Sequence, residues 1–207
     1  GLTVTITDTV NNDVDTVTGV ETLRFNDGDI AVSLDTNGLV LTGDITGDDI
    51  TIVGSVPVTV LGADGDDDIV GGSGNDIIDG NAGDDTITGG AGDDTIDGGD
   101  DTDIAIFAGS QADYTFESSA DGLTVTITDT VNNDVDTVTG VETLRFNDGD
   151  IAVSLDTNGL VLTGDITGDD ITIVGSVPVT VLGADGDDDI VGGSGNDIID
   201  GNAGDDT

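Results

Sequence analysis

The chain of 207 residues contains no cysteine, histidine, lysine, methionine or tryptophan. The absence of cysteine excludes a disulfide framework. A nucleophile activated by a base requires histidine, cysteine, lysine or a serine in a Gly-x-Ser-x-Gly turn, and the chain has none of these. We therefore predict that this stretch is not an enzyme, with no catalytic residue and no binding site for an organic cofactor.

Positive charge is almost absent as well. Two arginines, Arg24 and Arg145, accompany 45 acidic residues, which gives a formal net charge of −43. Charge of this sign excludes binding to nucleic acid or to an anionic membrane surface. No apolar run approaches the ~20 residues of a membrane-spanning helix, so we predict no membrane insertion. No signal peptide opens the sequence, and we expect either an internal part of a longer chain or export by another route.

The sequence does contain a nine-residue repeat. Five units follow one another over residues 62–106, and the first four carry glycine at the first and fourth places. Their eighth place is always isoleucine: Ile69, Ile78, Ile87 and Ile96. The glycine-rich half of a unit can turn tightly, because glycine adopts positive φ without steric cost. The other half, such as Thr-Ile-Thr, favours a short strand whose central residue points inward. Two units therefore make one coil of a parallel β-solenoid.

The sixth place of every unit is aspartate. Turns on the same side of the solenoid are then two units apart in sequence and about 4.8 Å apart in space. We call each line of same-side aspartates a file: Asp67, Asp85 and Asp103 form one, and Asp76 and Asp94 form the other. Carboxylates stacked this closely repel unless a cation lies between them, and hard oxygen ligands favour Ca²⁺ over softer metals. We predict calcium between successive aspartates of a file, and folding that depends on it.

This glycine- and aspartate-rich unit resembles the nonapeptide repeat of the RTX family. The resemblance implies an all-β fold, a right-handed parallel β-roll, with Ca²⁺ held by the sixth-place aspartates and by carbonyls of the turns. It also implies a bacterial protein that is extracellular or held at the cell surface. Export in this family is typically by a type I system that reads a C-terminal signal.

A longer repeat contains the shorter one. Residues 1–86 recur as residues 122–207 without a difference, at an offset of 121. Two units upstream of Asp67 the same place holds Asp49, which extends that file, whereas the other file ends at Val58, which offers no side-chain ligand. With the second copy, the predicted calcium ligands are Asp49, Asp67, Asp76, Asp85, Asp94, Asp103, Asp170, Asp188, Asp197 and Asp206. The expected pairs are Asp49–Asp67, Asp67–Asp85, Asp85–Asp103, Asp76–Asp94, Asp170–Asp188 and Asp188–Asp206, and Asp197 has no downstream partner.

These repeats predict how the chain is divided. We expect β-strand and hairpin flanks at 1–34 and 107–155, degenerate roll coils at 35–61 and 156–182, and calcium-binding rolls at 62–106 and 183–207. The flanks, with Gly-Val-Glu at 19–21 and Leu-Arg-Phe at 23–25, resemble the segment that commonly follows a roll in RTX proteins. We expect Arg24 to pair with a nearby carboxylate such as Glu21, and Phe107 with Tyr114 to plug the end of the roll.

The identity of the copies favours a structural role. A solenoid needs neighbours that cover its open ends, which suits a tandem array. We predict an extender or scaffold in a large adhesin-like surface protein, stiffened by calcium, with calcium and the neighbouring repeats as its partners. Two alternatives remain: units that self-associate through calcium into an extracellular filament or surface layer, and a repeat region attached to a secreted enzyme.

Overall fold

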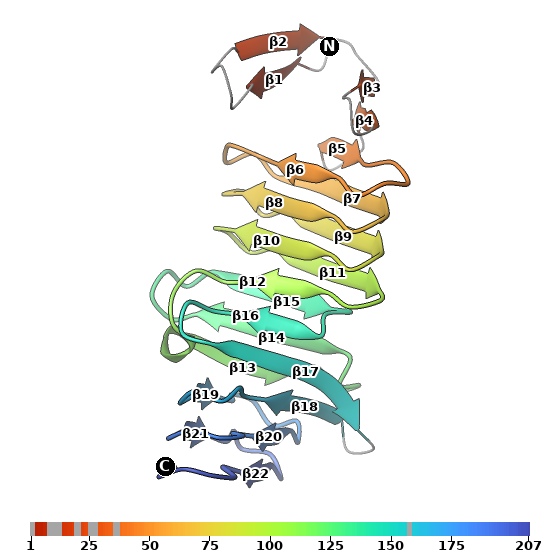
Figure 1. Cartoon of the computed structure of the whole chain (residues 1–207). Helices are drawn as coiled ribbons and strands as arrows, with labels where there is room; N and C mark the ends of the chain where they lie inside the picture. Colours follow the sequence, from red (N-terminus) through yellow and green to blue (C-terminus); the bar gives the residue numbers. More distant parts are fainter. Residues whose placement is uncertain (1–2, 8–13, 19–21, 25–28, 35–37, 157–158) are drawn as a thin grey trace.

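The computed structural model describes every residue except 1–2, 8–13, 19–21, 25–28, 35–37 and 157–158. The described part is an all-β solenoid of about nine turns with one short 3₁₀ helix, η1 (Gln111–Asp113). Its strands stack along a single long axis (Figure 1). The predicted all-β, parallel β-roll with antiparallel segments is therefore confirmed. Among the described residues, no helix is long and apolar enough to cross a membrane.

Two sheets of nine strands form opposite walls of the solenoid (Figure 1). The first wall contains, in spatial order, β6 (Asp49–Thr51), β8 (Asp68–Gly72), β10 (Thr86–Gly90), β12 (Ile104–Ile106), β16 (Thr143–Arg145), β17 (Asp150–Asp156), β18 (Gly159–Thr163), β20 (Thr180–Leu182) and β22 (Ile198–Asp200). The second wall contains β3 (Thr22–Arg24), β4 (Asp29–Leu34), β5 (Leu39–Thr42), β7 (Val58–Asp64), β9 (Ile77–Ala82), β11 (Thr95–Asp100), β15 (Val135–Thr139), β14 (Thr124–Asp129) and β13 (Tyr114–Ser118). Two further pairs are β1 (Thr3–Thr7) with β2 (Val14–Thr18), antiparallel, and β19 (Asp170–Thr172) with β21 (Asp189–Val191), parallel.

The nonapeptide units build the central coils in the predicted register. Ile69 pairs with Ile87 on the first wall, and Ile78 pairs with Ile96 on the second, so each partner lies two units further along the chain. These four side chains are at most 1% exposed. Complete burial of an isoleucine is worth about 1.5–3 kcal/mol, so this column supplies the apolar stabilisation of the roll.

One extra residue separates the upstream coils from the roll. Ile50 pairs with Ile69, one position beyond the partner that two nine-residue units would give it. The inward residues Ile50 and Val60 are ten positions apart, whereas Val60 and Ile69 keep the nine-residue spacing. The insertion therefore lies in the loop that carries Pro57. Burial of the apolar residues sets the register of these coils, and the turns absorb the added residue.

The flank between the two copies carries both walls from one roll to the next. The antiparallel strands β16, β17 and β18 link β12 to β20 in the first wall. On the second wall β15, β14 and β13 continue from β11, and β13 reaches β19 through a parallel bridge between Phe116 and Ile173. The backbone pairing is thus continuous across the junction.

The walls exchange roles at this junction. Strands β9 and β11, which follow Asp76 and Asp94, lie in the second wall. Strand β22 follows Asp197, the copy of Asp76, and lies in the first wall. Equivalent strands of successive copies therefore lie on opposite sides of the solenoid.

An aromatic cluster fills the core of the flank. The rings of Phe107 and Tyr114 meet edge to face with centroids 5.8 Å apart, so the two side chains pack together as predicted. Both walls continue past them, so they fill the core and do not close an end of the solenoid. Phe146 stacks on Phe107 at 5.5 Å and also contacts Tyr114, and Phe116 meets Phe146 edge to face at 6.0 Å. The Tyr114 hydroxyl donates a hydrogen bond to the Ala108 carbonyl. All four rings are buried, so the cluster joins the end of the first roll to the flank.

Candidate metal centres

One oxygen of each stacked carboxylate holds the coil above it. The Asp67 N–H donates to Asp85 Oδ1 at 2.8 Å, and the Asp85 N–H donates to Asp103 Oδ1 at 2.8 Å. On the other file the Val58 N–H donates to Asp76 Oδ1 at 2.9 Å, and the Asp76 N–H donates to Asp94 Oδ1 at 2.8 Å. Val58 thus occupies the place that the sequence predicted for it. Each file is a ladder in which carboxylates join successive turns.

The second oxygen of these carboxylates has no partner. Six Oδ2 atoms in the described part of the chain are buried without a hydrogen bond, those of Asp67, Asp76, Asp85, Asp94, Asp103 and Asp188. Their side chains are at most 3% exposed. A buried, unpaired carboxylate oxygen costs several kcal/mol unless a positive charge lies beside it.

Each unpaired oxygen lies against a glycine five residues earlier in the chain. A Cβ atom at Gly71 would lie 2.7 Å from Asp76 Oδ2 and 2.6 Å from the carbonyl oxygen of Gly89, one coil further on. The same meeting of a carboxylate oxygen and a next-coil carbonyl recurs at Gly43, Gly62, Gly80, Gly98, Gly164 and Gly183. The side chain that glycine lacks leaves room for oxygen ligands to converge.

This donor set fits calcium. All of its atoms are carboxylate or carbonyl oxygens, and Ca²⁺ takes six to eight such ligands in flexible geometry. Among the described residues, no three acidic side chains converge on one point. Main-chain carbonyls and water would therefore complete the coordination shell.

Burial and neighbouring negative charge raise the pKa of these carboxyl groups when no cation is present. The pKa of Asp67, Asp85 and Asp103 is raised to about 6 and that of Asp94 to about 7. Burial is the main cause; neighbouring carboxylates add to it, and the backbone hydrogen bonds partly oppose it. The pKa of Asp76 is raised as well, also mainly by burial. Bound cations would reverse these shifts.

A family model matches the sequence of these coils. The family model described as the RTX calcium-binding nonapeptide repeat matches four times, at residues 61–96, 70–105, 79–114 and 182–207. The chain carries RTX repeats. In solved structures, the extracellular lipase LipA from Serratia marcescens is similar at 24% identity and a TM-score of 0.44, over 75% of this chain. The chain spans 29% of the length of that lipase. No curated protein matches the sequence.

The structure corrects the prediction for the file of Asp67, Asp85 and Asp103 on the side upstream of Asp67. Because of the inserted residue, Asp49 pairs with Asp68 and is exposed, so the prediction that Asp49 stacks on Asp67 is wrong. Asp48 takes that place: it is 7% exposed, and its N–H donates to Asp67 Oδ1 at 2.7 Å.

The same correction applies in the second copy. Asp170 pairs with Asp189, whereas Asp169 is 1% exposed and donates its N–H to Asp188 Oδ1 at 3.0 Å. The next places hold the predicted residues. The Asp188 N–H donates to Asp206 Oδ1 at 3.3 Å, and the Val179 N–H donates to Asp197 Oδ1 at 3.1 Å.

Sequence reasoning missed how the flank closes both files. The Asp94 N–H donates to Asp136 Oδ1 at 2.9 Å, and the Asp103 N–H donates to Glu142 Oε2 at 2.9 Å. These acids lie 42 and 39 residues beyond the aspartates they hold, so the period of the repeat gives no sign of them. Burial raises the pKa of Asp136 to about 6, as within the roll.

Gln111 lies at the start of the file that contains Asp169 and Asp188 in the second copy. Its side chain is 1% exposed. Its Nε2 donates to Asp169 Oδ1 at 2.8 Å, and its Oε1 accepts from the Asp170 N–H at 3.0 Å. A buried amide thus supplies here the donor that a backbone N–H supplies elsewhere in the files.

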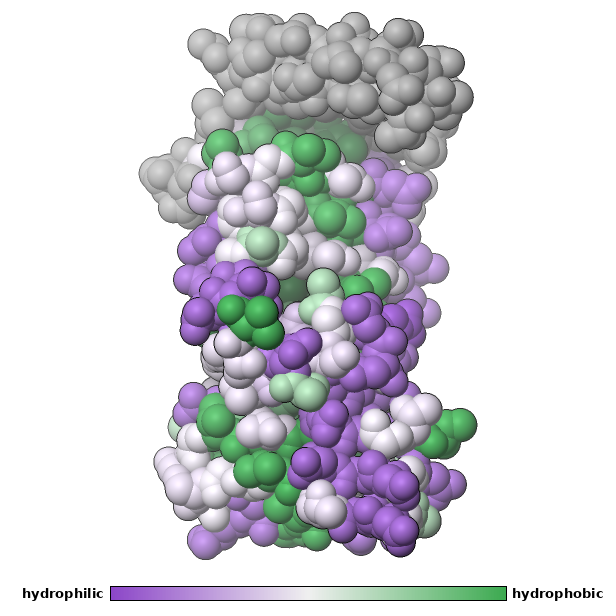
Figure 2. Space-filling model, turned by 90° about the vertical axis from the view of Figure 1, so that its left-hand side faces the viewer, coloured by the Kyte–Doolittle hydropathy of each residue, from purple (hydrophilic) through white to green (hydrophobic). Residues whose placement is uncertain are grey.

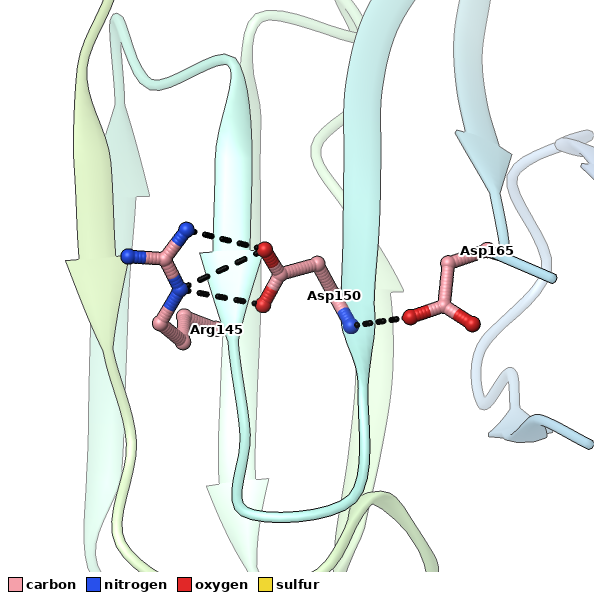
Figure 3. A network of polar contacts seen from close by, with 3 residues as sticks. All are labelled: Arg145, Asp150 and Asp165. Carbon is pink, nitrogen blue, oxygen red and sulfur yellow. Dashed lines mark hydrogen bonds and ion pairs between the residues drawn. The ribbon is translucent and has the colours of Figure 1, made fainter. Parts of the chain in front are cut away.

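An ion pair adds a contact on the outside of the junction. Arg145 on β16 binds Asp150 on β17, with Nη2 to Oδ2 at 2.9 Å, and the Asp150 N–H donates to Asp165 Oδ2 at 3.0 Å (Figure 3). The predicted pairing of Arg24 with Glu21 lies outside the residues whose side chains are described. In the second copy, the equivalent arginine pairs with Asp150.

Proposed function

We propose that this chain is a structural segment of a secreted or cell-surface bacterial RTX protein, which Ca²⁺ folds and stiffens into a rod. Asp67, Asp76, Asp85, Asp94 and Asp103, with their copies, would hold the ion together with carbonyls of the glycine turns. Bound calcium would supply the positive charge that the files lack. Asp49 and Asp170, now displaced from the files, leave the set, and Asp48 and Asp169 replace them.

The continuity of the walls across the junction carries this proposal. Nine strands, from β6 to β22, belong to one sheet that includes parts of both copies. A flexible linker between independent domains would break that sheet. A chain built in this way would hold its two ends at a fixed separation, as an extender of a large adhesin requires.

The dependence on calcium follows from charge. A net charge of −43 on 207 residues opposes compaction, and two arginines cannot offset it. Calcium outside the cell would therefore couple folding to export, since the ion binds the folded coils and not the unfolded chain.

Small-angle X-ray scattering and far-UV circular dichroism, in calcium and then in excess chelator, test this proposal. We expect a monomeric rod with β signal in calcium, and an expanded chain without β signal in chelator. A chain that stays compact and β-rich in chelator at neutral pH would refute the coupling of folding to calcium.

A filament or surface layer is the second candidate. Three apolar side chains of the degenerate coils, Ile45, Val53 and Val56, are 78%, 93% and 71% exposed. One lateral face also carries apolar patches among hydrophilic side chains (Figure 2). If calcium drives growth of particles in the same scattering experiment, this candidate replaces the single-chain rod.

A further inference from the structure

We propose that Glu142 and Gly140 of the flank complete a calcium site with Asp103 beyond the last nonapeptide unit. This inference rests on the proposed calcium binding of the roll. It adds a centre whose ligands come from a segment that contains no nonapeptide repeat.

The register places Glu142 in the file of Asp67, Asp85 and Asp103. Thr86 pairs with Ile104, and Ile104 pairs with Thr143, so Asp85, Asp103 and Glu142 each immediately precede residues that are stacked in one sheet. Glu142 Oε2 accepts the Asp103 N–H at 2.9 Å, as Asp103 Oδ1 accepts the Asp85 N–H. Glu142 therefore performs the same task as the aspartates, from a side chain that is one methylene longer.

The glycine cradle also continues into the flank. At Gly80, a Cβ would meet Asp85 Oδ2 and the carbonyl oxygen of Gly98. At Gly98, it would meet Asp103 Oδ2 at 2.6 Å and the carbonyl oxygen of Gly140. Gly140 thus supplies the carbonyl that a further nonapeptide would have supplied.

An unpaired oxygen points to a ligand at this place. Asp103 is 0% exposed, and its Oδ2 has no hydrogen-bond partner. The buried Asp103 Oδ2 and the Gly140 carbonyl oxygen both border Gly98. The Glu142 carboxylate belongs to the residue just before β16, the strand that pairs with β12. A small hard cation satisfies all three groups. Glu142 is exposed, so this site opens toward solvent and admits water ligands.

The test is to count bound calcium per chain by equilibrium dialysis and to titrate binding by calorimetry on the whole chain. Glu142→Gln retains the oxygen that accepts the Asp103 N–H and removes the charge. We expect it to bind one calcium ion fewer than the wild type, or to bind one ion at least tenfold more weakly. Glu117→Gln, an exposed glutamate on β13 of the same flank, is the matched control and should leave count and affinity unchanged.

Glu142→Asp separates a metal ligand from a structural acceptor. It restores the residue type found at the other places of the file, so it should retain the full count. If E142Q does not fold while E142D folds and binds the full number of ions, the requirement for charge still supports the site. Unchanged count and affinity in E142Q would overturn the inference while leaving the roll sites in place. A wild-type chain that binds no calcium would instead refute the proposed function itself.

Discussion

Replacement of Asp85 by asparagine should change stability in opposite directions with and without calcium. Asp85 is 1% exposed, its Oδ1 accepts the Asp67 N–H, and its Oδ2 has no partner. Asparagine keeps the Oδ1 acceptor and puts an N–H₂ group in the place of Oδ2. That place and the Gly98 carbonyl oxygen both border Gly80, where a Cβ atom would meet both. Relief of a buried unsatisfied group is worth about 1–3 kcal/mol, so D85N should stabilise the calcium-free fold by about that amount.

In calcium the same change should be destabilising. Asp85 belongs to two predicted pairs, with Asp67 and with Asp103. A site at a free calcium concentration about 100 times its Kd contributes about 2.7 kcal/mol, so loss of both sites would cost about 5 kcal/mol. For a chain of this size that amounts to a melting temperature about 10–20 °C lower.

The assay follows circular dichroism in two conditions. In saturating calcium it records thermal and urea unfolding, and in chelator, where the wild-type chain is expected to be unfolded, it records the gain of β signal as a stabilising osmolyte is added. Asp84→Asn is the control, because Asp84 lies in the same turn but is exposed, and asparagine can still accept the Thr102 N–H. It should shift neither curve by more than about 0.5 kcal/mol. If D85N lowered stability equally in calcium and in chelator, the aspartate would be a structural acceptor only, and our account of the files would be wrong.

Two further predictions concern other groups of the files as well as Asp85. In chelator, lowering the pH from about 8 to about 5 should increase the β signal. The folded-state pKa of Asp85 is about 6 and that of Asp94 about 7, both above the ordinary 3.8, so the folded chain binds protons more tightly than the unfolded chain. Protonation therefore stabilises the fold. This contribution is fully present below about pH 4 and is lost as the pH rises through 6 to 7. A β signal that falls on acidification in chelator would contradict it. Separately, Gln111→Ala should leave the Asp170 N–H and an Asp169 oxygen unpaired and lower the free energy of unfolding by about 2–5 kcal/mol. Amide hydrogen exchange should become faster in residues 159–207 and not in residues 62–106. An equal increase along the whole chain would show that the two rolls do not open separately.

The central coils could be predicted from sequence because their period is strict. A nine-residue spacing of Asp, Gly and Ile determines which residues share a wall, and Asp67, Asp76, Asp85, Asp94 and Asp103 occupy the predicted places. The prediction that calcium binds there stays a prediction until the ion is measured.

The edges of the roll could not be predicted in the same way. Counting back two full units assumed that the turn through Pro57 has the standard length, and the error at Asp49 came from that assumption. The inward residues held the missing signal, since Ile50 and Val60 are ten positions apart. For Asp136 and Glu142 the sequence gives no such sign, because a hairpin whose length is unrelated to the period brings them into line.

The exchange of walls at the junction would give an array of these units a parity. At the junction that the structure describes, equivalent strands lie in opposite walls. If each further junction repeats this exchange, a residue that faces one direction in an odd-numbered unit would face the opposite direction in an even-numbered one. Recombination that adds or removes a single unit would therefore lengthen or shorten the rod and also turn everything beyond that point to the other side. Adding or removing two units would change only the reach.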